Sequence, residues 1–425
     1  MSDQKTFLSE VMEHIKMKEA RKLVTAELSS HIEEGKKEWI GKGLDEKEAE
    51  EKAVEQMGNP YAIGEKFNKI YRPQVDWVTI GLLAAVLGLG FLPLIPLYAE
   101  TGDMRFINNR LLIIALGACS AAALMLWDYR KSSKWGWFFY ITGIALLWIM
   151  SRYSLPGLVT TVNGIPSLSI GPLTLSGYSV LIFFFIGWAA ILQKSNLRLW
   201  MFVILFFFPF YLLYKIHVSL CFFYTIMIYA MLFQSPVKRK LMLALTTCSL
   251  LAAAGIIYGV KMKSYLFDRI NGFLFPGDYS QTSGYIYVQI KDVLERAGWF
   301  GLPNILETNN GVPNAHTDFA FLSVTRSYGY LMALFLAAVL LAFFYRIMFI
   351  TSTIRDPFGK TLITGVGALY ITQVLYSIMM SMGLLPIMSV TLPFISYGLM
   401  PTLLNSVLIG MVLSIYRRKN ITAHI

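Results

Sequence analysis

The sequence predicts an all-α, polytopic membrane protein of about ten transmembrane helices, with a small helical domain at residues 1–72. First, 56% of the 425 residues are hydrophobic and the mean hydropathy is +0.55, more than a soluble core of this length requires. Second, the apolar residues beyond position 73 form long blocks, and a helix of about 20 apolar residues crosses a hydrocarbon layer of about 30 Å. Third, charged residues concentrate before and between these blocks.

Residues 1–72 have the pattern of a soluble helical module. Apolar residues recur at helical spacing among Lys and Glu, which predicts helices with one face for a small core. These residues are Phe7, Val11, Ile15, Leu23, Leu28 and Ile32. An acidic, alanine-rich helix follows, and Gly58-Asn59-Pro60 ends it. The pattern resembles the helical prefix domain of some bacterial permeases, so we expect a cytoplasmic regulatory or docking domain, and the alternative is a solvated helical bundle without a ligand.

Ten apolar blocks then follow one another within residues 73–425. Each can cross the hydrocarbon layer as a helix, and the shorter ones need their flanks to do so. The blocks are residues 77–98, 111–127, 135–150, 178–192, 199–214, 216–233, 241–260, 319–344, 362–382 and 394–416.

Basic residues set the expected orientation. Residues 1–73 hold 13 Lys and Arg against 15 Asp and Glu, which leaves 24 against 11 for the rest of the chain. The basic excess therefore belongs to the membrane segment, which favours topology signals and anionic lipid headgroups over nucleic acid as its explanation. Basic clusters follow alternate blocks on the side of the N-terminal domain, so we expect both termini in the cytoplasm.

Cysteine usage and the N-terminus exclude other classes. Cys119, Cys221 and Cys248 all lie inside apolar blocks, so neither a disulfide framework nor a metal cluster is predicted. The first residues are charged, so we expect no cleavable signal peptide.

One carboxylate stands apart, at the end of a long external loop predicted at residues 261–316. Of the 11 later acids, only Asp318 combines a position at the start of a long apolar block with a histidine two residues before it, His316. A carboxylate at a membrane border is costly to desolvate and marks a functional site. The alternative is a helix cap formed by Thr317 or Asp318. From Asp318 to Arg346 an unbroken helix measures about 42 Å, which predicts Asp318 near the outer headgroups.

The second half of the chain resembles a known family. Its motifs agree in order and spacing with the SEDS family, which comprises the FtsW, RodA and SpoVE proteins, over roughly residues 265–416. The matching residues are Arg269, Phe273-Leu274, Pro276, Asp278, Gly284-Tyr285, Gln289, Gly298, Gly301, Pro313, His316-Thr317-Asp318-Phe319, Gly383-Leu384-Leu385-Pro386 and Leu392-Pro393-Phe394-Ile395-Ser396-Tyr397-Gly398.

The resemblance implies a fold, an activity and a partner. Members of that family have ten spans and polymerise lipid II, an undecaprenyl-linked substrate, on the outer face of the bacterial cytoplasmic membrane. They work with a class B penicillin-binding protein in cell-wall synthesis for division, elongation or sporulation. The aspartate of the His-Thr-Asp-Phe motif is their essential catalytic residue, and here it is Asp318.

The chemistry of sugar transfer suggests roles for further residues. A base must take the proton of the attacking hydroxyl, and Asp318 is the candidate. Burial would raise its pKa and a helix N-terminus would lower it, and the sequence leaves that balance open. The pyrophosphate charge must also be met, by a divalent cation or by basic side chains. The candidate substrate-binding residues are His316, Thr317, Arg269, Gln289, Ser396 and Tyr397, the last two expected to face a cavity beside a broken helix start.

The chain also departs from the family pattern at acidic positions. Asn314 replaces the usual Glu before the histidine motif, and Arg326-Ser327 replace a Glu-Glu pair. The usual Pro-Ser-Glu motif becomes Leu175-Ser176-Gly177. These losses motivate an alternative function, a lipid-precursor flippase or a non-catalytic scaffold of a cell-wall synthesis complex.

Overall fold

The computed structural model describes residues 3–152, 158–162, 165–170, 173–193, 197–234, 238–261, 264–301 and 312–420. The chain forms two compact units: Met1–Val75 with Tyr416–Ile425, and Asp76–Ile415. The expected boundary is residue 72, and the first unit of the structure extends to Val75. The segment after the last span joins the N-terminal unit, which the sequence pattern did not predict.

The first unit is a bundle of four helices. They are α1 (Asp3–His14), α2 (Lys18–Gly41), α3 (Glu46–Met57) and α4 (Pro60–Ile70). The predicted apolar stripe forms the core, with Val11, Ile15 and Ile32 almost wholly buried. Gly58 ends α3 with a φ of 88°, and the Asn59 side chain accepts a hydrogen bond from the Tyr61 amide to start α4. The predicted helical module is thus observed.

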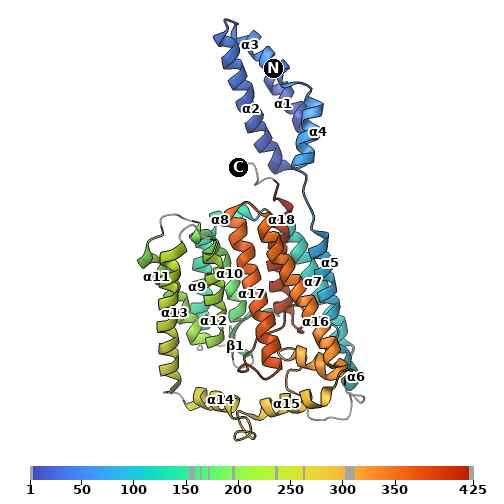
Figure 1. Cartoon of the computed structure of the whole chain (residues 1–425), viewed down its shortest axis with the longest axis vertical. Coiled ribbons are helices and arrows are strands. Elements are labelled where there is room, and N and C mark those ends of the chain that lie inside the picture. The colour runs from blue at the N-terminus through green and yellow to red at the C-terminus, as the bar shows by residue number, and fades with distance from the viewer. Residues whose placement is uncertain are drawn as a thin grey trace. The chain divides into compact units, whose positions relative to one another are not determined.

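The second unit is a bundle of apolar helices (Figure 1). Within the described residues, six segments are long and apolar enough to cross a membrane, by length and composition, and four shorter apolar helices accompany them. The six are Trp77–Ala99, which comprises α5 (Trp77–Leu89) and most of α6 (Leu94–Thr101), and then α7 (Arg105–Leu126), α11 (Leu199–Ile216), α16 (Ala320–Thr353), α17 (Pro357–Ser381) and α18 (Leu399–Arg417). The four are α9 (Gly136–Met150), α10 (Gly177–Leu192), α12 (Val218–Leu232) and residues Leu241–Ala252 of α13 (Lys238–Lys261). The fold class is therefore confirmed.

Helices α10 and α17 form the centre of this unit. Almost every residue of α10 is buried, because α9, α12 and α17 all pack against it. Gly365 of α17 allows the Phe185 ring of α10 to approach closely. Outer helices instead expose large apolar side chains such as Leu112 and Leu251, as expected of surfaces that face lipid.

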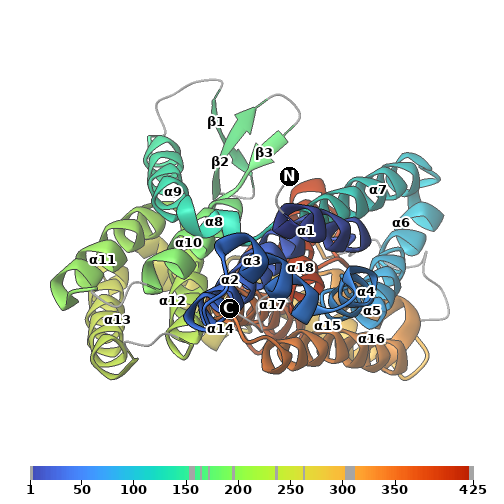
Figure 2. The same ribbon diagram turned by 90° about the horizontal axis from the view of Figure 1, so that it is seen from above.

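One end of the bundle carries most of the irregular structure. Helices α14 (Ser264–Leu274) and α15 (Tyr285–Ala297) lie across this end, which we call the α15 end, and the short α8 (Arg130–Lys134) lies at the opposite end (Figure 1). An antiparallel sheet of β1 (Val159–Val162), β2 (Ile165–Ile170) and β3 (Leu173–Leu175) stands beside α9 and α10 (Figure 2). Leu168 pairs with Val159 and with Leu175. The sheet leads directly into α10.

Helix α16 is broken at Gly329, whose φ of 81° and ψ of 178° are not helical. The amides of Tyr330 and Leu331, which start the second part, donate to the carbonyl oxygens of Gly298 and Trp299 after α15. Residues 320–328 are therefore a separate half-helix, and 330–353 is the longer part. The expected unbroken helix of about 42 Å from Asp318 to Arg346 is wrong, so that length does not give the depth of Asp318.

Candidate active site

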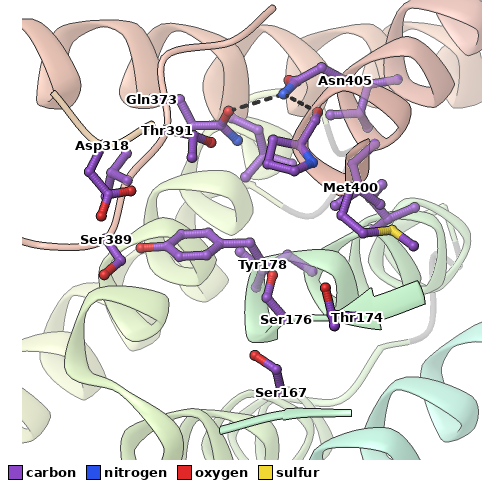
Figure 3. Close-up of a pocket in the computed structure, with 17 residues that line it drawn as sticks. Ser167, Thr174, Ser176, Tyr178, Asp318, Gln373, Ser389, Thr391, Met400 and Asn405 are labelled. Atoms are coloured by element: carbon purple, nitrogen blue, oxygen red, sulfur yellow. Dashed lines mark hydrogen bonds between the residues drawn. The ribbon is translucent and has the colours of Figure 1, made fainter. Parts of the chain in front are cut away.

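A cavity of about 190 Å³ opens among α10, α17, α18 and the sheet. Asp318 contributes the one carboxylate among its lining residues. The polar lining residues are Ser167, Thr174, Ser176, Tyr178, Asp318, Gln373, Ser389, Thr391 and Asn405, and the apolar ones are Leu181, Ile182, Leu369, Val390, Met400, Pro401, Leu404 and Leu408. Figure 3 shows Asp318 and Ser389 on one side, with the phenol end of Tyr178 pointing toward them.

Burial dominates the electrostatics of Asp318. Its exposed fraction is 8%, and burial raises the pKa of its carboxyl to about 6. Of the two opposing effects left open by the sequence, desolvation is thus the larger. Helix α16 begins at Ala320, and its N-cap residue is Phe319, without a side-chain capping bond. The alternative of a helix cap at Thr317 or Asp318 therefore finds no support in this geometry.

The segment before Asp318 is a tight turn built on Asn314. Asn314 has a φ of 58°, a left-handed conformation that asparagine tolerates better than most residues. Its carbonyl oxygen accepts hydrogen bonds from the amide of Thr317 at 3.0 Å and from the Thr317 hydroxyl at 3.2 Å. The Thr317 side chain thus closes the turn and orients the residue that follows.

A second segment, residues 392–397, braces this turn. The Ser396 hydroxyl donates to the Thr317 carbonyl oxygen at 2.6 Å, and the Tyr397 amide donates to the His316 carbonyl oxygen at 2.9 Å. Ser396 is 1% exposed, and neither Ser396 nor Tyr397 lines the cavity. The expectation that both face the cavity is therefore wrong for the cavity that contains Asp318. Residues 396–397 position the Asp318 segment through its backbone.

Arg110 of α7 holds the bracing segment in turn, a role that the sequence did not reveal. Its guanidinium is fully buried and donates to the carbonyl oxygens of Ser396, at 3.2 Å, and of Phe394. Phe394 has a φ of 62°, which is strained for an aromatic residue. The bonds from Arg110 stabilise this conformation. Basic residues are common at membrane interfaces, and Arg110 directly precedes an apolar block. The sequence therefore did not distinguish it from an interfacial residue.

His316 faces a different, smaller cavity of about 60 Å³. Arg326, Ser323 and Ser327 line the same cavity. Burial lowers the pKa of His316, and its ring contacts Tyr397 edge-on, with centroids 6.0 Å apart. The Asp318 segment thus separates two cavities, and the structure does not bring the His316 ring and the Asp318 carboxylate to one cavity wall.

A hydrogen-bond chain leads from the larger cavity toward Arg269. The Tyr178 hydroxyl donates to the Ser219 hydroxyl at 3.0 Å, and that hydroxyl contacts Nδ1 of His217 at 2.6 Å. Burial and the charge of Arg269 both lower the pKa of His217. Arg269 is exposed on α14, and Gln289 is half-buried on α15. Neither lines the cavity around Asp318, so their substrate-binding roles stay predictions.

The sequence did contain a signal for part of the cavity wall. Gln373 and Asn405 are amides inside apolar spans, where polar side chains are costly and mark function. The Asn405 side chain donates to Gln373 at 3.5 Å and to the Pro401 carbonyl oxygen at 2.9 Å (Figure 3). Gln373 lies eight residues before the end of α17, about 12 Å along the helix. The cavity therefore extends into the bundle from the α15 end.

The described residues contain no group of three or more His, Cys, Asp or Glu side chains that could hold a metal ion. Asp318 could offer a single carboxylate, so a divalent cation would take its other ligands from substrate phosphates and water. The involvement of a divalent cation stays a prediction.

The second unit is similar in sequence to known proteins. The family model FTSW_RODA_SPOVE, described as "Cell cycle protein", matches residues 76–421. The probable peptidoglycan glycosyltransferase FtsW of Dichelobacter nodosus is 30% identical over 301 residues, which are 67% of this chain and 73% of that protein. The protein of the same name from Pseudomonas fluorescens is 27% identical over 80% of this chain and 88% of its own length. The match to that of Saccharophagus degradans, at 32% identity, covers 42% of this chain and 46% of that protein.

Solved structures share the fold. A chain of a peptidoglycan synthase complex, described as coordinating polymerization and crosslinking, has a TM-score of 0.67 and 19% identity, covering 81% of this chain and 98% of that one. The rod shape determining protein RodA of Thermus thermophilus has a TM-score of 0.58 and 18% identity, covering 81% of this chain and 97% of its own.

Proposed function

Since this chain belongs to the FtsW, RodA and SpoVE family of cell cycle proteins, we propose that it is a peptidoglycan glycosyltransferase that polymerises lipid II. The observation that carries the proposal is the position of Asp318. It is the one carboxylate among the lining residues of the cavity, and burial raises its pKa to about 6. A general base is most effective when its pKa lies near the working pH, and a carboxylate of ordinary pKa is a weaker base.

The proposed reaction is an inverting sugar transfer. The deprotonated Asp318 accepts the proton of the acceptor sugar hydroxyl as its oxygen attacks the anomeric carbon of the lipid-linked donor. The new glycosidic bond forms as the bond from that carbon to the pyrophosphate breaks, and undecaprenyl pyrophosphate leaves with the bonding electrons. The proton then passes from Asp318 to water or to the leaving group. Positioned proton transfer of this kind contributes about 10²–10⁴-fold to rate.

The two sides of the cavity suit the two parts of such a substrate. Hydroxyl groups from the sheet and from Ser389 and Thr391 offer donors and acceptors to a sugar. Leucine side chains of α17 and α18, including Leu369, Leu404 and Leu408, offer an apolar surface to a polyprenyl chain. This arrangement supports a polar, lipid-linked ligand over a water-soluble one.

We place the α15 end, and Asp318 with it, on the outside of the cytoplasmic membrane, and both termini inside. The basic clusters after alternate spans support this orientation. A cysteine at Asn314 should react with a membrane-impermeant thiol reagent added to intact cells, and one at Arg355 should not. Both positions are exposed, so burial does not confound the comparison. The opposite labelling pattern would overturn the orientation.

We expect a class B penicillin-binding protein as the partner, in division, elongation or sporulation. The relatives' names and the fold shared with a chain of a peptidoglycan synthase complex support this expectation. The test is polymerisation of purified lipid II by the purified protein, with and without a co-expressed partner. Glycan product from the wild type and its loss in Asp318→Asn would support the assignment.

Asp292→Asn is the matched control. It also removes one carboxylate at the α15 end, but Asp292 pairs with Arg296 on α15 and lines none of the cavities described above. This control should keep wild-type activity. Full activity in Asp318→Asn, under conditions in which the wild type makes polymer, would refute the role of Asp318 as the general base.

The alternative, a precursor flippase or a non-catalytic scaffold, still rests on Arg326-Ser327 and Asn314 in place of acidic residues. A transport route needs polar surface through both halves of the bilayer. The polar lining described here gathers toward the α15 end, which favours transfer over transport. Translocation of lipid II in vesicles without polymer formation would reverse this order.

A further inference from the structure

The first unit contains a concave basic surface on α4 and the residues that follow it. Lys16, Lys66, Lys69 and Arg72 line a cavity of about 900 Å³ together with Glu65 and Asn68. The four cations come from the α1–α2 connection, from α4 and from the segment that leads to the first span. We call these four side chains the basic concavity. With a single acid among its lining residues, it has a strong excess of positive charge.

The cations of the basic concavity differ from lysines elsewhere in the same unit. Lys36 pairs with Glu46 at 2.8 Å, and Lys42 pairs with Glu38 at 2.7 Å. Among the residues that the structure describes, the side chains of Lys16, Lys66, Lys69 and Arg72 form no ion pair and no hydrogen bond. All four are exposed. Like charges gathered on one surface repel one another, so an anionic ligand would relieve this repulsion.

Glu65, the acid of this surface, forms no ion pair with the four cations among the described residues. Its carboxylate accepts a hydrogen bond from the Tyr61 hydroxyl at 3.1 Å. The acids of the unit concentrate elsewhere, since α3 alone holds five glutamates and two lysines. The charge of the unit is therefore divided, with an acidic helix α3 and a basic surface at α4, although its total is nearly balanced.

Covalent geometry brings the basic concavity near the membrane. Arg72 precedes Trp77, the first residue of α5, by five residues, so an extended chain between them measures at most about 18 Å. Trp77 is 74% exposed at the start of this span, as aromatic residues at membrane interfaces are. The bound follows from chain length alone and holds for any orientation of the two units. A second connection leads back from α18, where the Gln74 amide donates to the Arg417 carbonyl oxygen at 3.3 Å.

We propose that the basic concavity binds the headgroups of anionic phospholipids in the leaflet from which the first span emerges. A cluster of Lys and Arg next to a membrane span is attracted to anionic lipid, at about 1 kcal/mol for each cation close to the surface. The concave shape allows several cations to surround one phosphate, and a lysine ammonium binds phosphate as a point charge. Binding of this kind fixes the orientation of the first unit and makes it depend on lipid composition and ionic strength. This inference does not depend on the proposed enzymatic activity.

The test is hydrogen–deuterium exchange of the full-length protein in nanodiscs. One preparation contains phosphatidylcholine alone, and the other contains about 30 mol% phosphatidylglycerol. Backbone amides of residues 60–72 should exchange more slowly with phosphatidylglycerol present, and salt at about 0.5 M should remove the difference because it screens the charges. Equal exchange in both preparations at low salt would overturn the proposal.

A pair of matched variants separates the basic concavity from general charge. Lys66→Gln with Lys69→Gln removes two of its cations and should lower the equilibrium constant for docking about 25-fold, about fivefold for each cation. Lys37→Gln with Lys47→Gln removes two exposed lysines of α2 and α3 and should leave the lipid effect unchanged. Equal loss in both variants would show a non-specific charge effect and refute the site. Melting temperatures measured alongside confirm that each variant is folded.

A further exchange experiment distinguishes lipid headgroups from free phosphate as the ligand. Inorganic phosphate added to the phosphatidylcholine nanodiscs should not slow the exchange of residues 60–72. The same protection by phosphate alone would refute the membrane headgroup as the ligand.

Discussion

The Ser396 hydroxyl donates a hydrogen bond of 2.6 Å to the carbonyl oxygen of Thr317, the residue before Asp318. The same hydroxyl accepts a hydrogen bond of 2.8 Å from the Leu392 amide. One buried side chain thus joins two segments separated by 79 residues and fixes the backbone beside the carboxylate.

Ser396→Ala should therefore impair catalysis more than substrate binding. The substitution leaves buried backbone groups without a partner, which costs about 1–3 kcal/mol of stability. A shift of about 1 Å in a catalytic group lowers rate about 100-fold, so we expect kcat to fall by 10- to 100-fold at most. Ser381→Ala is the control, because the buried Ser381 hydroxyl has no hydrogen-bond partner in the described part of the chain. Polymerisation kinetics and melting temperature of both variants check the prediction.

Arg110→Met should lower activity while it changes stability little. Removal of the guanidinium leaves the carbonyl oxygens of Phe394 and Ser396 without their donor, but it also removes the cost of burying a charge. These effects oppose each other, so we expect a small change in melting temperature and a loss of activity of at least about tenfold. Arg105→Met, on the same helix but 87% exposed, should leave activity unchanged. A variant of Arg110 with wild-type activity would show that the bracing segment holds its position alone.

The activity should depend on pH through Asp318. The base form prevails above the pKa of about 6, so the rate should fall as pH drops through this value, about tenfold for each pH unit below it. The measurement is kcat for polymer formation between pH 5 and 8, in steps of about half a unit. A rate that stays constant down to about pH 4.5 would exclude a base with the raised pKa.

The same raised pKa predicts an effect on stability. Its folded value exceeds the ordinary 3.8, so the contribution of Asp318 to stability is greatest below about pH 4 and is lost as pH rises through about 6. At pH 7.5, Asp318→Asn should accordingly have a free energy of unfolding that exceeds the wild-type value by at most about 3 kcal/mol. It should therefore melt at a higher temperature. The two proteins should differ less near pH 4, and thermal unfolding at both values checks the sign.

Gly329→Ala should distort the segment that leads from Asp318 into the membrane. An added Cβ would collide with the backbone of Trp299 and Gly301, and the φ of 81° is unfavourable for alanine. We expect the free energy of unfolding to fall by about 2–4 kcal/mol, seen as a lower melting temperature. Gly88→Ala is the control, since nothing lies within 4 Å of its added Cβ and alanine favours a helix.

Apolar block lengths predicted the spans well, because backbone groups in a membrane must bond within each helix. The ten blocks correspond to six long segments and four shorter helices of the described chain. Asp318 could be found because carboxylates are rare after residue 73. The sheet at residues 159–175 was missed, although Asn163-Gly164 is a typical hairpin dipeptide between alternating residues.

The bracing contacts could not be predicted in the same way. Arg110 meets Phe394 across 284 positions of sequence, and its partners are backbone carbonyl groups, which every residue possesses. A contact of this kind requires no particular residue type as the partner, so the sequence does not reveal it. The break in α16 was missed for a different reason, because a lone glycine such as Gly329 is common in spans and rarely breaks them.

The break at Gly329 also resolves a problem of hydrophobic mismatch. An unbroken helix of the 34 residues of α16 would measure about 51 Å, far longer than a hydrocarbon layer of about 30 Å, and would have to tilt steeply or thicken the bilayer. The 24 residues after the break measure about 36 Å and fit the layer with a modest tilt. Thinner or thicker membranes should therefore change the tilt of residues 330–353 and leave the half-helix beside Asp318 in its place against α15.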